Sequence, residues 1–164
     1  MNGDAGGLVG KFRGVVSDNR DPEMRGRIRA KVAALNDLEV SWALPCLPYG
    51  GNGVGLFLVP PTKANVWIEF EGGDVNYPVW TGCFWDLGQA PATPGVAEKK
   101  VLKTDNATVT LDDLPGVGGV TIETKAGMKI TMTATGVEIV NGLNASVKLS
   151  GPQVSINGNA LEVM

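Results

Sequence analysis

Histidine is missing from this chain of 164 residues, and cysteine is scarce. Without histidine the protein lacks the side chain most used as a general base near neutral pH and as a metal ligand. Its two cysteines, Cys46 and Cys83, are too few for a disulfide framework or a zinc site, and we expect both to be buried thiols. These absences argue against most hydrolase mechanisms, and we expect no catalytic residues, no metal and no cofactor.

A net positive charge and long apolar runs are also lacking. A formal net charge of -3 and a pI of about 4.9 disfavour a protein that holds nucleic acid by neutralising phosphates. No apolar run is long enough to span a bilayer, and the first ten residues lack the basic region and apolar core of a signal peptide. We therefore expect synthesis in the cytoplasm and no nucleic-acid partner.

Aromatic residues occur only in the first half of the chain, and the last of them is Trp85. Because aromatic side chains bury the largest areas, the first half can close a compact core by itself. The segment 89–100 is rich in proline, glycine and alanine, which is typical of a linker. We therefore expect one domain over residues 1–88, a linker over 89–100 and a second domain over 101–164.

Short strands separated by turn residues fill the first domain, so we expect an all-β fold. Alternating apolar residues and the positions of glycine and proline predict five strands. They are Leu8 to Val16, Arg27 to Val32, Leu56 to Val59, Asn65 to Glu71 and Pro78 to Phe84. Five short strands within 88 residues favour a small closed barrel such as the OB-fold.

The second domain consists of period-two strands punctuated by glycine. The glycines recur at intervals of 6 to 9 residues, at Gly119, Gly127, Gly136, Gly142, Gly151 and Gly158. Between them Val, Ile, Leu or Met alternates with Thr, Ser, Glu or Lys, so each strand has one apolar face. With only aliphatic residues on that face, one chain would bury little, and a partner is required.

A triangular prism of three identical chains would bury these faces. In this interpretation each strand lies on one face of the prism, each glycine turns a corner, and the aliphatic residues fill the axis of an intertwined, trimeric β-helical needle. The residues expected in the needle core are Val120, Ile122, Met128, Ile130, Met132, Val137, Ile139, Val147, Leu149, Val154 and Ile156.

A series of motifs in the first domain resembles a known family. In order along the chain they are Val15-Val16, Asp18-Asn19-Arg20-Asp21-Pro22, Gly26-Arg27-Ile28, Ser41-Trp42-Ala43, the glycine-rich stretch from Tyr49 to Gly55, Leu58-Val59-Pro60, Val66 to Phe70, and Gly72-Gly73-Asp74 through Gly82. This order resembles the central spike proteins of contractile phage tails, called baseplate assembly protein V, and the related VgrG proteins of type VI secretion. The glycine-punctuated second domain is similar to the β-helical needle of that family.

The resemblance implies a structural, non-enzymatic spike that assembles into the baseplate of a phage virion or related particle and pierces the target envelope when the sheath contracts. It implies a homotrimer, a separate baseplate hub protein above the barrel, and a tip protein of the PAAR type at the apex. The last four residues, Leu161, Glu162, Val163 and Met164, would dock that tip protein. Some phage needles hold iron through histidines, and this chain has none to supply that site.

Two other function classes stay open from the residues themselves. A basic stretch of Arg20, Arg25, Arg27, Arg29 and Lys31, with Trp42 and Tyr49, could line an OB-fold groove for single-stranded nucleic acid or an oligosaccharide. Paired carboxylates such as Glu69 and Glu71 could serve a carbohydrate-acting tail enzyme. Salt-sensitive retention on single-stranded DNA would favour the binding module, and turnover of an envelope polysaccharide would favour the enzyme.

Overall fold

The computed structural model describes residues 7–158 and 160–163, and the chain divides into two compact units, residues 1–88 and 89–164. Strands build both units, and the helices of the described residues are two three-residue 3-10 turns, Ala33–Leu35 and Glu71–Gly73. None of these turns could cross a lipid bilayer. The fold is therefore all-β, as the sequence predicts.

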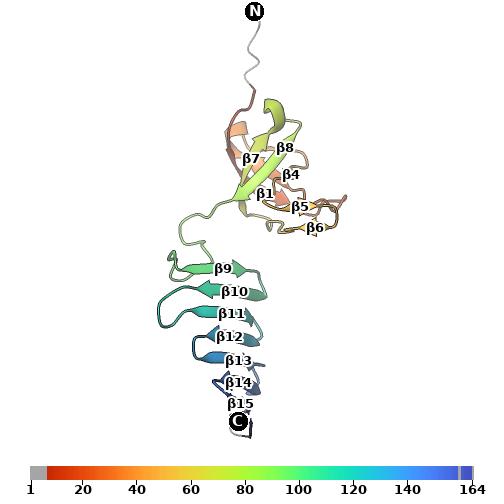
Figure 1. Cartoon of the computed structure of the whole chain (residues 1–164). Coiled ribbons are helices and arrows are strands. Elements are labelled where there is room, and N and C mark those ends of the chain that lie inside the picture. The colour runs from red at the N-terminus through yellow and green to blue at the C-terminus, as the bar shows by residue number, and fades with distance from the viewer. Residues whose placement is uncertain (1–6, 159, 164) are drawn as a thin grey trace, which may run out of the picture. The chain divides into compact units, whose positions relative to one another are not determined.

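The first unit contains a six-stranded sheet, in which antiparallel pairing predominates (Figure 1). Its central strands are β1, β7 and β8, which pair as antiparallel neighbours. In spatial order the strands are β3 (Leu38–Glu39), β2 (Arg29–Val32), β1 (Phe12–Asp18), β7 (Asn65–Phe70), β8 (Pro78–Cys83) and β4 (Leu44–Pro45).

The segment from β3 to β4 closes this sheet into a barrel. β3 pairs with β2 at one edge of the sheet, while β4 pairs in parallel with β8 at the other edge. Between them, Ala43 and Ile28 exchange two backbone hydrogen bonds, with N–O distances of 2.8 and 3.2 Å. Closure matters because it removes the open edges at which a sheet would pair with other chains.

A single apolar core fills the barrel. β7 shows why, because its residues alternate between half-buried and buried positions and send Val66, Ile68 and Phe70 inward. The indole Nε1 of Trp80 donates a 3.1 Å hydrogen bond to the carbonyl oxygen of Gly26, so this buried ring leaves no polar atom unpaired. The buried hydrophobic residues are Val16, Ile28, Ala30, Val32, Val40, Ala43, Val66, Ile68, Phe70 and Trp80.

The turn between β1 and β2 is organised by the carboxylate of Asp21. Its oxygens accept hydrogen bonds from the guanidinium of Arg27, at 2.7 and 3.1 Å, and from the backbone amides of Glu23, Arg25 and Arg27. The Arg27 guanidinium, together with these amides, holds the pKa of Asp21 well below its usual range, and the same ion pair raises the pKa of Arg27. The role of this charged motif is therefore structural: Asp21 and Arg27, which we call the Asp21 clamp, hold the turn between β1 and β2 in place.

One expected strand is absent. Residues 56–59, which the sequence predicts as a strand, have no ladder partner in the described chain, and three of their side chains are largely exposed. Instead a two-stranded hairpin of β5 (Gly50–Gly51) and β6 (Val54–Gly55) precedes them. The apolar run is followed directly by Pro60-Pro61, and proline cannot donate to a ladder, so apolar composition alone misled the strand prediction here.

The second unit is an eight-stranded antiparallel meander in which every strand pairs with its neighbours in sequence order (Figure 1). Lys99 and Lys100 pair with Asp112 and Leu111 of β10, so β9 begins at Lys99. The first strand of this unit therefore starts two residues before the end of the segment 89–100 that was expected as a linker. The strands are β9 (Lys99–Lys103), β10 (Ala107–Asp112), β11 (Gly119–Thr124), β12 (Lys129–Thr133), β13 (Gly136–Val140), β14 (Ser146–Ser150), β15 (Gln153–Ile156) and β16 (Leu161–Val163).

The periodic glycines lie in or beside the hairpin connections of this meander. Gly127, Gly142 and Gly151 have positive φ angles of 90, 74 and 56°, which L-residues other than glycine rarely adopt. Gly136 opens β13, and a β-carbon there would collide with the carbonyl oxygen of Leu149 on the next strand. The glycines thus turn the chain between adjacent strands of one sheet, and the corners between faces predicted for them are not seen within the chain.

Candidate functional site: the apolar face of the second sheet

The strand register of the second unit aligns its apolar residues in two columns on one face. Directly opposite residues of an antiparallel pair share a face, and Ile122 lies opposite Ile130, which lies opposite Ile139. The first column is Leu111, Val120, Met132, Val137, Leu149, Val154 and Val163; the second is Leu102, Val109, Ile122, Ile130, Ile139, Val147, Ile156 and Leu161. We call this surface the apolar face.

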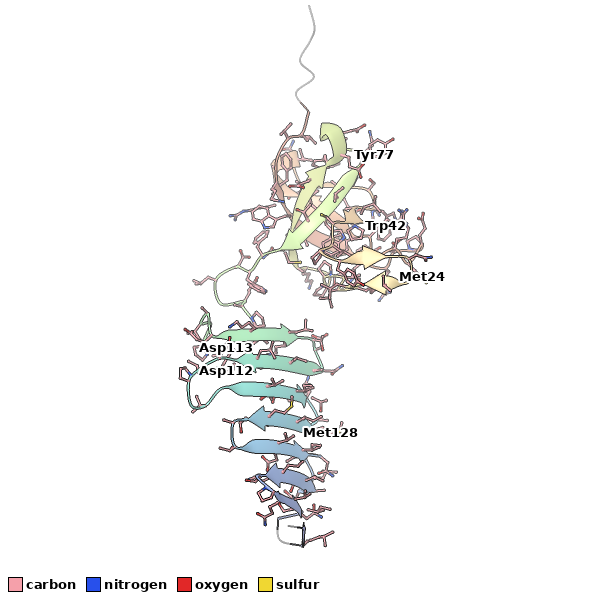
Figure 2. The ribbon with its side chains drawn as sticks, in the orientation of Figure 1. Met24, Trp42, Tyr77, Asp112, Asp113 and Met128 are labelled. Atoms are coloured by element: carbon pink, nitrogen blue, oxygen red, sulfur yellow. The ribbon has the colours of Figure 1, made fainter. Side chains whose placement is uncertain are left out.

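Ten of the eleven residues expected in the needle core occupy these two columns. The eleventh, Met128, precedes β12, where its carbonyl oxygen accepts a hydrogen bond from the amide of Thr124. Figure 2 shows Met128 and Asp113 at opposite edges of the sheet. Leu102, Val109 and Leu111 also lie in the two columns, although they are not among the residues expected in the needle core; the alternation of residues 108–111 is sufficient to identify the last two.

The apolar face is open to solvent in the single chain. Among residues 89–158 and 160–161 no side chain is buried, and Ile130, Ile139 and Leu149 are 37, 44 and 41% exposed. A groove of about 530 Å³ runs along the second column and is bordered by Thr124, Asn141 and Asn157. An ordered aliphatic surface of this extent in water is the mark of an interface.

The opposite face of the sheet is polar. Its register places Glu123 opposite Lys129 and Glu138 opposite Lys148, which are favourable cross-strand charge pairs. At the first hairpin, Lys99 lies opposite Asp112, and their charged atoms are 3.8 Å apart. The sheet is therefore amphipathic, and its polar face suits contact with water.

The C-terminal residues continue the pattern as far as the structure describes them. β16 pairs with β15 so that Leu161 lies opposite Ile156 and Val163 opposite Val154. Leu161 is 54% exposed. Glu162 falls between them in the alternation, and Met164 lies outside the described residues.

The residues considered for other functions are placed differently. Most of the basic stretch is neutralised locally, because Arg27 contacts Asp21 and Glu23, Arg25 contacts Glu23, and Arg29 contacts Glu39. Glu69 is bound by the ammonium group of Lys11 at 2.7 Å, and Glu71 belongs to the following turn. The structure thus gives Arg25, Arg27, Arg29 and Glu69 structural partners.

The acidic side chains and the two cysteines are the remaining candidates for metal binding and thiol chemistry. No group of three or more Cys, Asp or Glu side chains there could hold a metal ion. Cys46 and Cys83 are free thiols and both are exposed, so the prediction that they are buried is wrong. Cys46 directly follows the short β4 edge strand and Cys83 is the last residue of β8, and each side chain meets solvent there, although partial burial still raises the pKa of Cys83.

Comparison with protein families identifies the class of both units. Residues 12–85 match the injector OB domain of type VI secretion systems and phage baseplates, and residues 99–162 match the C-terminal trimerisation domain of phage baseplate V. These are the domains of a spike-type baseplate protein, and the OB-type barrel is confirmed. The chain belongs to the phage baseplate V family. A search of the curated proteins finds no significant match.

The family match indicates that the apolar face lies in a domain that forms trimers. The trimerisation domain spans all residues of both columns except Val163, so the solvent-exposed aliphatic surface falls in the part of the family that assembles as a trimer. This match supports a homotrimer and a structural role in a baseplate particle.

Proposed function

We propose that three copies of this chain form the central spike of a contractile injection machine, which pierces the target envelope when the sheath contracts. The observation that carries the proposal is the exposed apolar face within the trimerisation domain. The proposed role is mechanical and requires no reacting group. The protein would be made in the cytoplasm and assembled into the baseplate of the particle.

The amphipathic sheet suggests how a needle is built. Each chain would supply one side of a triangular prism, with its apolar face toward the three-fold axis and its polar face toward water. Burying apolar surface contributes roughly 25 cal/mol per Å², so two columns of aliphatic residues give a large driving force for association. Eight strands at about 4.8 Å spacing would give a needle roughly 35 Å long.

Stiffness follows from the same geometry. In such a prism the hydrogen bonds between strands run along the needle axis. Once the side chains of three apolar faces interdigitate, their close packing resists bending of the needle. The meander departs from the intertwined winding predicted from the glycines, because consecutive strands stay in one sheet. A prism with one sheet on each side satisfies both the family match and the observed register.

The mass of the purified protein tests the proposal directly. Light scattering at micromolar concentration is expected to give the mass of three chains of 17.1 kDa. In assembled particles, dye entry into target cells on sheath contraction would then measure piercing. A folded monomer at that concentration, or full dye entry with particles that lack this chain, would contradict the proposal.

Two protein partners belong to the same proposal: a separate hub protein above the barrel and a PAAR-like tip protein at the apex. In the register of β16, Leu161 and Val163 extend the two apolar columns to the last strand. Three chains would therefore end in a small apolar platform formed by residues 161–164, the surface that a tip protein would cover.

Deleting residues 161–164 separates assembly from tip docking. The truncated chain keeps β9 to β15, so the trimer is expected to persist with a slightly lower melting temperature while capture of the tip protein is lost. A pull-down with the tip protein of the same machine measures docking, and light scattering is the control for assembly. Equal capture by truncated and intact trimers would place the docking surface elsewhere.

A further inference from the structure

The chain contains four Asn-Gly pairs, at residues 2–3, 52–53, 141–142 and 157–158. In such a pair the backbone nitrogen of glycine can attack the side-chain amide of asparagine, because glycine has no side chain to shield it. The first pair lies outside the described residues. The other three occupy turns of very different construction.

Asn52 and Gly53 form the two-residue turn of the β5–β6 hairpin, between the paired residues Gly51 and Val54. Both residues are exposed, and a β-carbon at Gly53 would meet no atom within 4 Å. The hydrogen bonds of the described chain include none to the side chain of Asn52. Its amide is therefore free to rotate toward the Gly53 nitrogen.

The side chains of Asn141 and Asn157 are held instead. Oδ1 of Asn141 accepts hydrogen bonds from the backbone amides of Leu143 and Ala145, at 2.8 and 3.0 Å. Oδ1 of Asn157 accepts one from the backbone amide of Ser146 at 2.9 Å, while the backbone amide of Asn157 donates to the Ser146 carbonyl oxygen at 2.8 Å. Attack by the following glycine would require these hydrogen bonds to open first.

We propose that, of the three Asn-Gly pairs that the structure describes, the folded protein deamidates spontaneously at Asn52 ahead of Asn141 and Asn157. The Gly53 nitrogen bonds to Cγ of Asn52 and loses its proton, and the side-chain nitrogen leaves as ammonia with that proton, which gives a cyclic imide. Water then opens the imide at either carbonyl. Opening at Cγ gives aspartate, and opening at the backbone carbonyl gives isoaspartate.

The product changes the hairpin in two ways. It places a carboxylate in a stretch of chain whose apolar residues Tyr49, Val54 and Phe57 are 62, 56 and 68% exposed. Isoaspartate also adds a methylene to the backbone between Gly51 and Val54, which the two-residue turn has no room to absorb without loosening the pair. Deamidation would thus remodel this barrel surface without touching the core.

Peptide mapping by mass spectrometry tests the proposal on the full chain. Intact protein is incubated at mildly alkaline pH, which speeds the loss of the amide proton, and the deamidated fraction is followed at each pair. Since opening two protein hydrogen bonds precedes reaction at Asn141, we expect Asn52 to react roughly tenfold faster or more than either other site. Circular dichroism at each time point confirms that the chain stays folded.

Two controls isolate the structural cause. In denaturant the three pairs should react at similar rates, because the dipeptide is the same and the protecting hydrogen bonds are gone. Asn52→Gln keeps an amide but cannot form the five-membered imide at a comparable rate, so the signal from that peptide should vanish. Equal native rates at the three pairs, or slower reaction at Asn52, would overturn the proposal.

Discussion

The two units solve the problem of burying apolar residues in different ways. The barrel closes on itself and buries ten hydrophobic residues within one chain, including a tryptophan and a phenylalanine. The second sheet stays open, and none of its described side chains is buried. A closed sheet has an inside that one chain can fill, whereas an open sheet has a face that only another surface can cover.

The difference follows from side-chain size as well as from topology. A barrel core of β-branched residues completed by aromatic rings reaches the packing density of a protein interior. The apolar face of the second sheet carries no aromatic ring, and a single layer of smaller apolar side chains cannot exclude water. The first unit should therefore fold independently of concentration, and the second should gain its stability from assembly.

Charge on the apolar face should have the largest effect. Ile130→Lys would bring three ammonium groups together without partners, at a cost on the order of several kcal/mol for each chain, and should abolish the trimer. Thr131→Lys is the matched control, since Thr131 faces the polar side opposite Glu138 and should tolerate lysine. Sedimentation velocity measures both. Equal behaviour of the two variants would mean that the face assignment is wrong.

Truncating one isoleucine in each unit sharpens the contrast. Ile68→Ala in the barrel core should cost about 2–5 kcal/mol, at every protein concentration. Ile139→Ala in the sheet should lower a melting temperature that rises with protein concentration. Because every aromatic residue precedes residue 86, tryptophan fluorescence reports the barrel alone, and far-ultraviolet circular dichroism reports both units. A concentration-independent melt of the sheet would contradict assembly-driven stability.

Glycine substitutions test the tight approach between strands. Gly136→Ala would drive a β-carbon into the Leu149 carbonyl at a φ of 151°, and it should destabilise the sheet by about 1–3 kcal/mol. Gly151→Ala has a positive φ but no atom within 4 Å of its β-carbon, so it should cost about 1 kcal/mol. Thermal melts by circular dichroism compare the two. A smaller loss for Gly136→Ala would rule out the close strand approach.

The smallest expected effect concerns pH and belongs to the barrel. Since the pKa of Asp21 in the folded state lies below its ordinary value of 3.8, its contribution to stability is complete above about pH 5 and is lost as the pH falls further. Asp21→Asn should lower barrel stability at pH 7 and reduce the loss between pH 5 and 3. Denaturant unfolding followed by tryptophan fluorescence measures both. An unchanged pH dependence would show that the clamp is not the titrating element.

Much of the fold and of the apolar face could be predicted from the sequence. The absence of aromatic residues after Trp85 indicated two units of different chemistry. Period-two alternation predicted a shared face for the eleven residues expected in the needle core, and the strand register aligns ten of them on one face. Alternation is reliable because the strand geometry itself sends successive side chains to opposite sides. The order of motifs from Val15 to Gly82 indicated the family, which the family models confirm.

Other features depended on contacts that sequence does not display. Residues 56–59 have the composition of a strand but no ladder partner, and the glycine spacing fits a hairpin as well as a corner. The exposure of Cys46 and Cys83 likewise followed from where their strands end. The sequence by itself determined which side chains alternate and which must be covered. Only the tertiary structure decided which strands are neighbours, because pairing depends on hydrogen bonds between segments that local pattern does not specify.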